Sequence, residues 1–166
     1  WGASKRELLV ESLRRLGSGS SLPRAIELPL DSCFGTVRID PERCTLCLAC
    51  ATICPTGAMQ AQASSWTELL FLELDCVQCG LCREACPEAA LQLEPRLLLT
   101  DEALSLRRLQ GEEMELCPQC GEPVASKSLL QGIEARLKGH WMFQEQSARN
   151  RFFLCADCKA RAALKE

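Results

Sequence analysis

The sequence predicts an α+β protein with two equivalent halves in its middle part and a small helical module at its C-terminal end. Three observations support this fold class. Eight cysteines in the middle of the chain repeat with an offset of 32 residues, β-prone apolar segments flank both sets, and two further Cys-x-x-Cys pairs enclose a helical pattern. Duplication of this kind predicts two halves related by a pseudo-two-fold axis. The 166 residues are enough for two small domains with cores of their own.

The first part of the chain predicts a helix and a flexible linker. Ser4 and Glu7 form a capping box at the start of a helix over residues 4–16, and Gly17 is its expected stop. One apolar stripe follows the helical period: Leu8, Leu9, Leu13 and Leu16. This stripe needs a partner surface, from the rest of this chain or from another protein. The composition of residues 17–21 predicts a flexible linker.

The internal repeat is the most informative feature of the sequence. Its first set is Cys44, Cys47, Cys50 and Cys54, and its second set is Cys76, Cys79, Cys82 and Cys86. The repeat continues beyond the cysteines, because Cys-Pro-x-x-Ala-x-Gln begins at both Cys54 and Cys86. In each half we expect a strand, a cysteine loop, a one-turn helix and a second strand. A short strand is predicted near Thr36–Ile39, and a well-buried one is predicted at Glu68–Leu74.

This cysteine spacing is typical of 4Fe–4S clusters, because soft thiolates hold iron in tetrahedral sites. In the pattern Cys-x-x-Cys-x-x-Cys-x-x-x-Cys-Pro, the fourth cysteine binds the other cluster of the pair. The first cluster is therefore expected at Cys44, Cys47, Cys50 and Cys86, and the second at Cys76, Cys79, Cys82 and Cys54. This cross-over brings the clusters close together, as electron transfer requires. Every iron is then fully ligated, so no catalytic residues are expected.

Residues 37–94 resemble the bacterial-type dicluster ferredoxins, with all eight ligands and both Cys-Pro pairs present. The resemblance implies two 4Fe–4S clusters, since no ligand is replaced, and an electron-transfer function rather than an enzymatic one. The sequence departs from the family at one position. Gly80 follows Cys79, as is usual there, but Leu48 follows Cys47. We expect this side chain to shield the first cluster from water, so that the two potentials differ, with a sign that the sequence leaves open.

A second group of cysteines lies near the end of the chain: Cys117, Cys120, Cys155 and Cys158. Two Cys-x-x-Cys pairs predict a structural four-thiolate zinc site. The alternatives are a single rubredoxin-like iron, and free thiols or a disulfide switch. His140, the only histidine, could replace one thiolate, but it is more simply a helix-end residue beside aromatic neighbours. Cys33 is expected to be a spare thiol.

Helices are expected around this second group. One is predicted at 127–138, capped by Ser126 or Ser128 and ended by Gly139, and another begins at the second cysteine pair. Before them, residues 96–116 predict an extended connector with a helical turn. The aromatic group at Trp141–Phe143 and Phe152–Phe153 is expected to form core around the metal site.

Composition limits the partners and the compartment. Twelve cysteines in metal-type spacing imply reducing conditions and hence the cytoplasm. No apolar run is long enough for a transmembrane span. The formal net charge of −3 argues against nucleic-acid binding. Four segments follow from the sequence: an N-terminal helix and linker (1–32), a dicluster ferredoxin domain (33–95), a connector (96–116) and a zinc-ribbon-like module (117–166).

The whole arrangement resembles bacterial 4Fe–4S proteins that are associated with formate dehydrogenases and other respiratory molybdenum enzymes. The resemblance implies redox partner proteins of that kind. The sequence therefore predicts an electron-transfer protein with two 4Fe–4S clusters and one zinc ion. The alternative is a redox-sensing regulatory or assembly module whose zinc module binds a partner protein or nucleic acid.

Overall fold

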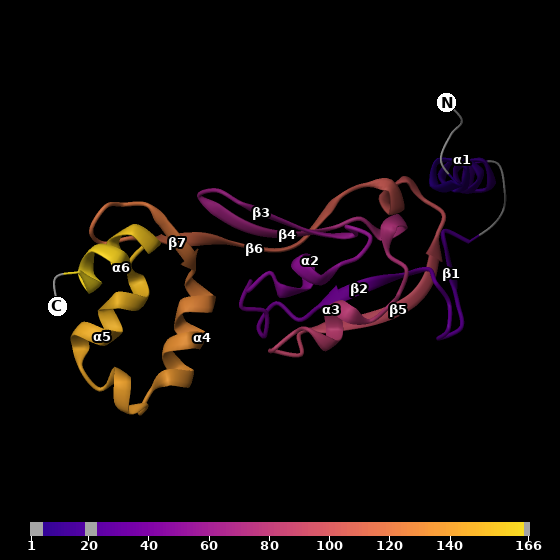
Figure 1. Ribbon diagram of the computed structural model, residues 1–166. Helices are drawn as coiled ribbons and strands as arrows, with labels where there is room; N and C mark the ends of the chain where they lie inside the picture. Colours follow the sequence, from indigo (N-terminus) through magenta and orange to yellow (C-terminus); the bar gives the residue numbers. More distant parts are fainter. Residues whose placement is uncertain (1–4, 19–22, 165–166) are drawn as a thin grey trace. The chain divides into compact units, whose positions relative to one another are not determined.

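The computed structural model describes residues 5–18 and 23–164, which form two compact units (Figure 1). The first unit contains Trp1–Arg43, Leu48–Ala61 and Leu69–Leu109, and the second contains Cys44–Cys47, Gln62–Glu68 and Gln110–Glu166. Ser4, half of the predicted capping box, and most of the predicted linker lie outside the described residues. The mixture of helices and strands agrees with the predicted α+β class.

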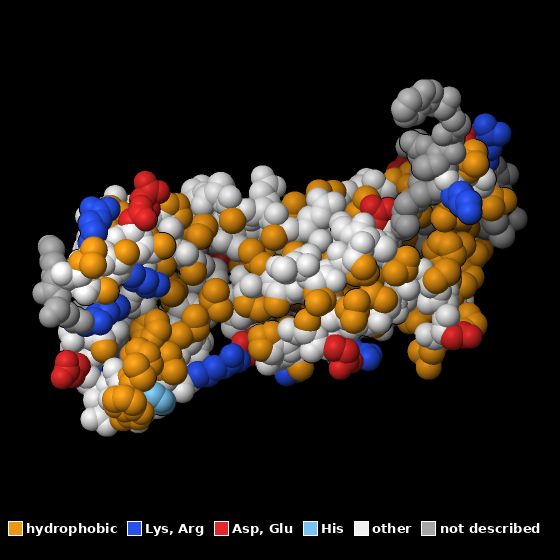
Figure 2. All heavy atoms as spheres, viewed as in Figure 1, with side chains coloured by type: hydrophobic (Ala, Val, Ile, Leu, Met, Phe, Trp, Pro, Cys, Tyr) orange, Lys and Arg blue, Asp and Glu red, His pale blue; other side chains and the backbone are white. Residues whose placement is uncertain are grey.

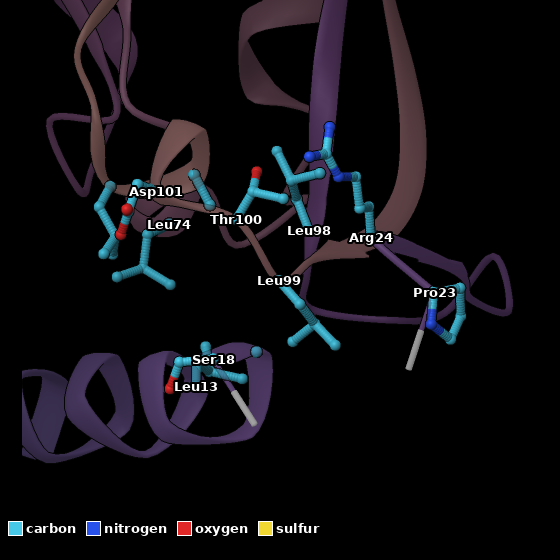
Figure 3. Close-up of a pocket in the computed structure, with 12 residues that line it drawn as sticks. Leu13, Ser18, Pro23, Arg24, Leu74, Leu98, Leu99, Thr100 and Asp101 are labelled. Atoms are coloured by element: carbon cyan, nitrogen blue, oxygen red, sulfur yellow. The ribbon is translucent and has the colours of Figure 1, made fainter. Parts of the chain in front are cut away.

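Helix α1 (Lys5–Ser18) is found where a helix was predicted and continues to Ser18, one residue beyond the expected stop at Gly17. Leu9 and Leu13 of its apolar stripe are half-buried, whereas Leu8 and Leu16 are more than half exposed. Leu13 and Ser18 line a cavity of about 550 Å³ whose other wall includes Leu98–Asp101 (Figure 3). This chain therefore covers part of the stripe. None of the predicted metal ligands lines this cavity.

The first sheet joins the beginning and the end of the cysteine repeat. Its strands are β1 (Ala25–Glu27), β5 (Leu91–Leu98) and β2 (Gly35–Ile39), in the order β1-β5-β2, and both pairs are antiparallel. Val37 lies opposite Leu93, and Ile39 lies opposite Leu91. Val37 and Leu91 are buried, so this sheet contributes to the core of the first unit.

The second sheet has the strand order β3-β4-β6-β7. Its strands are β3 (Met59–Ala63), β4 (Trp66–Phe71), β6 (Arg107–Leu116) and β7 (Pro123–Ser126). The predicted strand at Glu68–Leu74 is therefore shifted, because the chain leaves the sheet after Phe71 and turns into η1 (Glu73–Asp75). In β4, Thr67, Leu69 and Phe71 alternate with more exposed residues and are buried. The connector contains its expected helical turn, η2 (Asp101–Leu104), but most of the rest is strand, since β5 ends at Leu98 and β6 starts at Arg107.

The two halves of the repeat adopt the same local backbone. Each has a short helix, α2 (Ala49–Ile53) or α3 (Leu81–Glu84), preceded by a residue in the left-handed region, Leu48 (φ 60°) or Gly80 (φ 80°). The amide of Thr52 donates to the Leu48 carbonyl at 3.1 Å, and the amide of Glu84 donates to the Gly80 carbonyl at 3.1 Å. The predicted sequence of loop, one-turn helix and strand is therefore present twice.

Hydrogen bonds between strands are exchanged between the halves. Strand β2, which precedes the first cysteine set, pairs with β5, which follows the second cysteine set. Strand β4, which precedes the second cysteine set, lies beside β3, which follows the first cysteine set. Outside the strands, the amide of Asp40 donates to the carbonyl of Ala90, and the amide of Leu72 donates to that of Ala58, both at 2.8 Å. These two bonds are related by the offset of 32 residues, as a pseudo-two-fold axis requires.

The C-terminal part contains a sequence of short helices. They are α4 (Lys127–Leu137), η3 (Trp141–Phe143), α5 (Gln146–Asn150), η4 (Arg151–Phe153) and α6 (Ala156–Ala163). The predicted cap is confirmed, because the Ser126 hydroxyl accepts a hydrogen bond from the amide of Leu129. The same hydroxyl donates to the carbonyl of Thr45 at 2.9 Å, so the buried Ser126 also holds the loop between Cys44 and Cys47.

The aromatic group was expected to be core, and for two of its members this was wrong. The small core of this part consists of Cys117, Leu154 and Cys158, with Val124, Cys155 and Ala162 packed against it. Trp141 is 74% exposed and Met142 is 55% exposed. Figure 2 shows the single histidine beside hydrophobic side chains at the surface, and the ring of His140 lies 5.9 Å from that of Trp141. Phe143, Phe152 and Phe153 are half-buried.

A buried carboxylate in η1 contacts arginines of strands β5 and β6. Glu73 is 5% exposed at its side chain and accepts two hydrogen bonds of 2.8 Å from the guanidinium of Arg96. Arg107 lies 3.7 Å from the same carboxylate, stacks over Phe71 and donates to the hydroxyl of Thr36 at 2.5 Å. These contacts compensate a charge whose burial alone would be costly.

Replacing Arg96 by Met is predicted to destabilise the protein by about 3 kcal/mol, because it leaves Glu73 buried without its bidentate partner. The value is at the lower end of the usual range because Arg96 is itself a quarter exposed. Urea unfolding under anaerobic conditions measures the change. The matched control is Arg38→Met, which breaks an ion pair with Glu94 on the surface and should hardly move the urea midpoint. Equal effects of the two substitutions would contradict this assignment.

Candidate metal centres

Four cysteines from both halves of the repeat meet at one cavity in the first unit. Cys54, Cys76, Cys79 and Cys82 all line it, together with apolar residues that include Val37, Met59 and Leu93. Cys54 follows α2, Cys76 follows η1, and Cys82 lies in α3. The three cysteines of the second set are thus joined by the last cysteine of the first set, which is the combination expected for the second cluster.

The sulfur atoms at this cavity accept hydrogen bonds from the surrounding chain. The amide of Met59 donates to Cys54 Sγ at 3.4 Å, and the Gln78 side-chain amide donates to Cys76 Sγ at 3.3 Å. Donors of this kind stabilise thiolates and are common around iron–sulfur clusters. For Cys54 they outweigh the opposing effect of burial, so that its pKa is below the usual thiol value.

Cys76 and Cys82 would lose their protons with difficulty in the absence of a cation. Burial raises the pKa of Cys76, and burial together with repulsion from Cys76, Cys79 and Cys54 raises the pKa of Cys82 to about 11. Four negative sulfurs around one cavity are stable only if positive charge lies between them. The donor set therefore fits a 4Fe–4S cluster, whose irons supply that charge.

The cysteines expected at the first cluster are divided between the two units. Cys50 and Cys86 belong to the first, and Cys44 and Cys47 belong to the second. The amide of Ala90 donates to Cys86 Sγ at 3.3 Å, so this sulfur has a backbone donor as Cys54 does. The loop before α2 repeats the conformation of the loop before α3, since φ is 53° at both Leu46 and Gln78. The loops before α2 and α3 therefore share a left-handed residue between their first two cysteines.

The C-terminal cysteines converge within the second unit. The Sγ atoms of Cys117, Cys120, Cys155 and Cys158 all lie within 4.8 Å of one another. The turn after Cys117 is closed by the amide of Gly121, which donates to the Cys117 carbonyl at 2.8 Å. Gly121 adopts a positive φ of 78°, as expected for the glycine of a Cys-x-x-Cys-Gly turn. The group is suited to a tetrahedral metal ion.

Charge at these four sulfurs also favours a cation. Burial by itself would raise the pKa of Cys117, but backbone amides of Cys155, Gln119 and Cys120 outweigh it and lower the pKa to about 6. Burial and the neighbouring sulfurs raise the pKa of Cys158 to about 12. One thiol is thus prepared for ionisation while another resists it, which is what a compact group of four sulfurs does until a metal ion offsets the repulsion.

The predictions for His140 and Cys33 can be compared with the geometry. His140 is not a member of the four-sulfur group found among the described residues; its Nδ1 accepts a hydrogen bond from the amide of Met142. Cys33 is exposed and lies in neither group of converging sulfurs. The sequence did not predict two contacts that support the sites. They are the hydrogen bond from Gln78 to Cys76 Sγ and the hydrogen bond from Ser126 to the carbonyl of Thr45. Neither role is visible in a spacing pattern, because each depends on a residue distant in the chain.

Comparisons with known proteins identify the repeat. The family model of the 4Fe-4S binding domain matches residues 37–60 and 71–92, which together contain both cysteine sets. The chain matches none of the curated proteins. In the described part of the chain, no helix has the length and apolar character needed to cross a membrane. The middle of this protein is therefore similar to 4Fe–4S binding domains, and this similarity implies that it binds an iron–sulfur cluster.

Proposed function

We propose that this protein transfers single electrons between redox partner proteins through two 4Fe–4S clusters. The observation that carries the proposal is the cavity lined by Cys54, Cys76, Cys79 and Cys82, because its ligand set crosses between the halves of the repeat. By the repeat, Cys44, Cys47, Cys50 and Cys86 hold the other cluster. A 4Fe–4S cluster supplies a one-electron couple. One electron leaves the donor protein and one reaches the acceptor, and no bond is made or broken.

The residues around the cavity control access to it. Val37 and Met59 are buried and shield it from water, whereas Cys79 is exposed and Val77 and Leu81 are exposed large apolar residues. A partly apolar surface beside one ligand allows a partner protein to approach closely. All eight thiols of the repeat serve as ligands, so no substrate chemistry is proposed. The resemblance noted in the sequence makes a formate dehydrogenase-type oxidoreductase the first partner to test.

Anaerobic reductive titration of the purified protein should produce two interacting S = 1/2 signals in electron paramagnetic resonance, and metal analysis should give about eight irons per chain. The reason is that both sets of four thiols are complete. A protein that contains these irons but is not reduced at accessible potentials would contradict an electron-transfer function. The same preparation mixed with a reduced candidate partner tests the transfer itself.

Replacing Cys54 by Ala should remove the signal of the second cluster and keep that of the first, with iron content falling by about half. The physical reason is that Cys54 shares its cavity with Cys76, Cys79 and Cys82. Paramagnetically shifted cysteine protons in NMR spectra identify the remaining cluster. Cys33→Ala, at an exposed cysteine outside both sets, is the control and should change neither signal. If the first cluster were the one lost, the cross-over assignment would be wrong.

We further propose that the C-terminal sulfurs hold one zinc ion in a structural role. Its ligands are Cys117, Cys120, Cys155 and Cys158, and the closed four-sulfur shell leaves no position for a substrate. The core cluster around these sulfurs consists largely of ligands, Cys117 and Cys158, together with Leu154. Metal binding therefore contributes directly to its folding.

Replacing Cys158 by Ser should release the zinc and unfold the helices of residues 127–163 while the visible absorption of the iron–sulfur clusters remains. Cys158 is buried in the small core, so the substitution removes both a ligand and packing. Zinc analysis and far-ultraviolet circular dichroism measure the two effects, and Cys33→Ser is the matched control. Loss of the visible absorption together with the zinc would show that the two metal centres do not form independently.

A further inference from the structure

Gln78 places a side-chain donor at one sulfur of the second cysteine set. Its Nε2 lies 3.3 Å from Cys76 Sγ and 3.2 Å from the carbonyl oxygen of Thr36. Both partners are acceptors, so the two hydrogens of the amide are used and the NH2 end of the side chain must face them. Gln78 lies between Cys76 and Cys79 in the sequence but is not itself a ligand.

The surroundings of Gln78 hold this donor in place. A Cβ on Gly35 would lie 2.5 Å from Cδ and 2.6 Å from Nε2 of Gln78, so the amide occupies space that exists only because residue 35 is glycine. The acceptor is equally well held, because Thr36 is 2% exposed and its hydroxyl bonds to Arg107. Arg107 in turn lies beside the buried carboxylate of Glu73. The amide therefore rests on a continuous polar network.

The first half of the repeat lacks this arrangement. Leu46 is the counterpart of Gln78, with the same φ of 53°, and its buried side chain has no hydrogen-bond donor. Gly35, which leaves room for the Gln78 amide, has Thr67 as its counterpart in the repeat. The two cysteine sets thus have similar backbones but differ in side chains near the sulfurs: Gln78 corresponds to Leu46, and Thr56, whose hydroxyl lies 3.7 Å from Cys54 Sγ, corresponds to Glu88.

On the basis of the electron-transfer function proposed above, we propose that Gln78 makes the second cluster the more easily reduced of the two. Reduction adds negative charge to the cluster and its ligand sulfurs, and an N–H group that points at a sulfur stabilises that charge. The singly reduced protein then carries its electron at Cys54, Cys76, Cys79 and Cys82. Because Cys79 is exposed there, this is the end from which an electron leaves toward an acceptor.

The test is an anaerobic redox titration of the holoprotein and its Gln78→Leu variant. The higher of the two potentials should fall, with a change of about tenfold in the reduction equilibrium constant (about 59 mV for a one-electron couple), and the lower should stay unchanged. Leucine is compatible with this backbone, since Leu46 has the same φ. Gln92→Leu, at an exposed glutamine of β5, is the control and should move neither potential.

A second variant and a second measurement keep the outcome decisive. Gln78→Glu has the same shape but a carboxylate, which cannot donate and is negative, so the higher potential should fall further. Resonance Raman spectra of the oxidised protein in H2O and D2O should show a solvent-isotope shift of the Fe–Sγ bands that decreases in Gln78→Leu. Unchanged potentials and unchanged Raman shifts in both variants would overturn the role of Gln78. Clusters that cannot be reduced at all would instead overturn the electron-transfer function, while the Raman comparison would still test Gln78.

Discussion

The exchange of backbone hydrogen bonds between the two halves of the repeat is the constraint on which the rest of the first unit depends. Because β2 pairs with β5 and β4 lies beside β3, neither half can form its strands without the other. The bonds from Asp40 to Ala90 and from Leu72 to Ala58 continue this exchange up to the cysteine loops. Cys54 is thereby carried to the cavity of Cys76, Cys79 and Cys82. A single half would supply three thiols and lack the fourth.

The two kinds of cysteine group solve the same electrostatic problem with different surroundings. At the cavity of the repeat, a few N–H groups point at the sulfurs and apolar side chains surround them. Burial and repulsion between the sulfurs raise the pKa of Cys82 to about 11. In the C-terminal group, backbone amides of two tight turns lower the pKa of Cys117 to about 6. The first environment suits a redox cofactor whose potential the protein must control. The second suits a metal ion that stabilises a small fold.

Duplication has left the backbone nearly equal in both halves, and the differences lie in a few side chains. Leu48 occupies a left-handed position where the other half has Gly80, and such a conformation costs a leucine about 1 kcal/mol that glycine avoids. Leu46 corresponds to Gln78, and Thr67 corresponds to Gly35. The difference at Gln78 changes hydrogen bonding at one cysteine set, because its amide donates to Cys76 Sγ. Similar folding of the halves is thus compatible with different properties of the two sites.

The sequence by itself determined the repeat, the 4Fe–4S binding character of the region, a helix at 127–138 with a serine cap, and the existence of a second four-cysteine group, because these depend on local spacing and period. It did not predict that β6 would be a ten-residue strand or that Trp141 would be exposed, since pairing and burial depend on distant residues. Only the tertiary structure brought the Gln78 amide to the Thr36 carbonyl, through the space beside Gly35, and Ser126 to Thr45. Such contacts join residues about 40 and 80 positions apart, where no periodic signal exists.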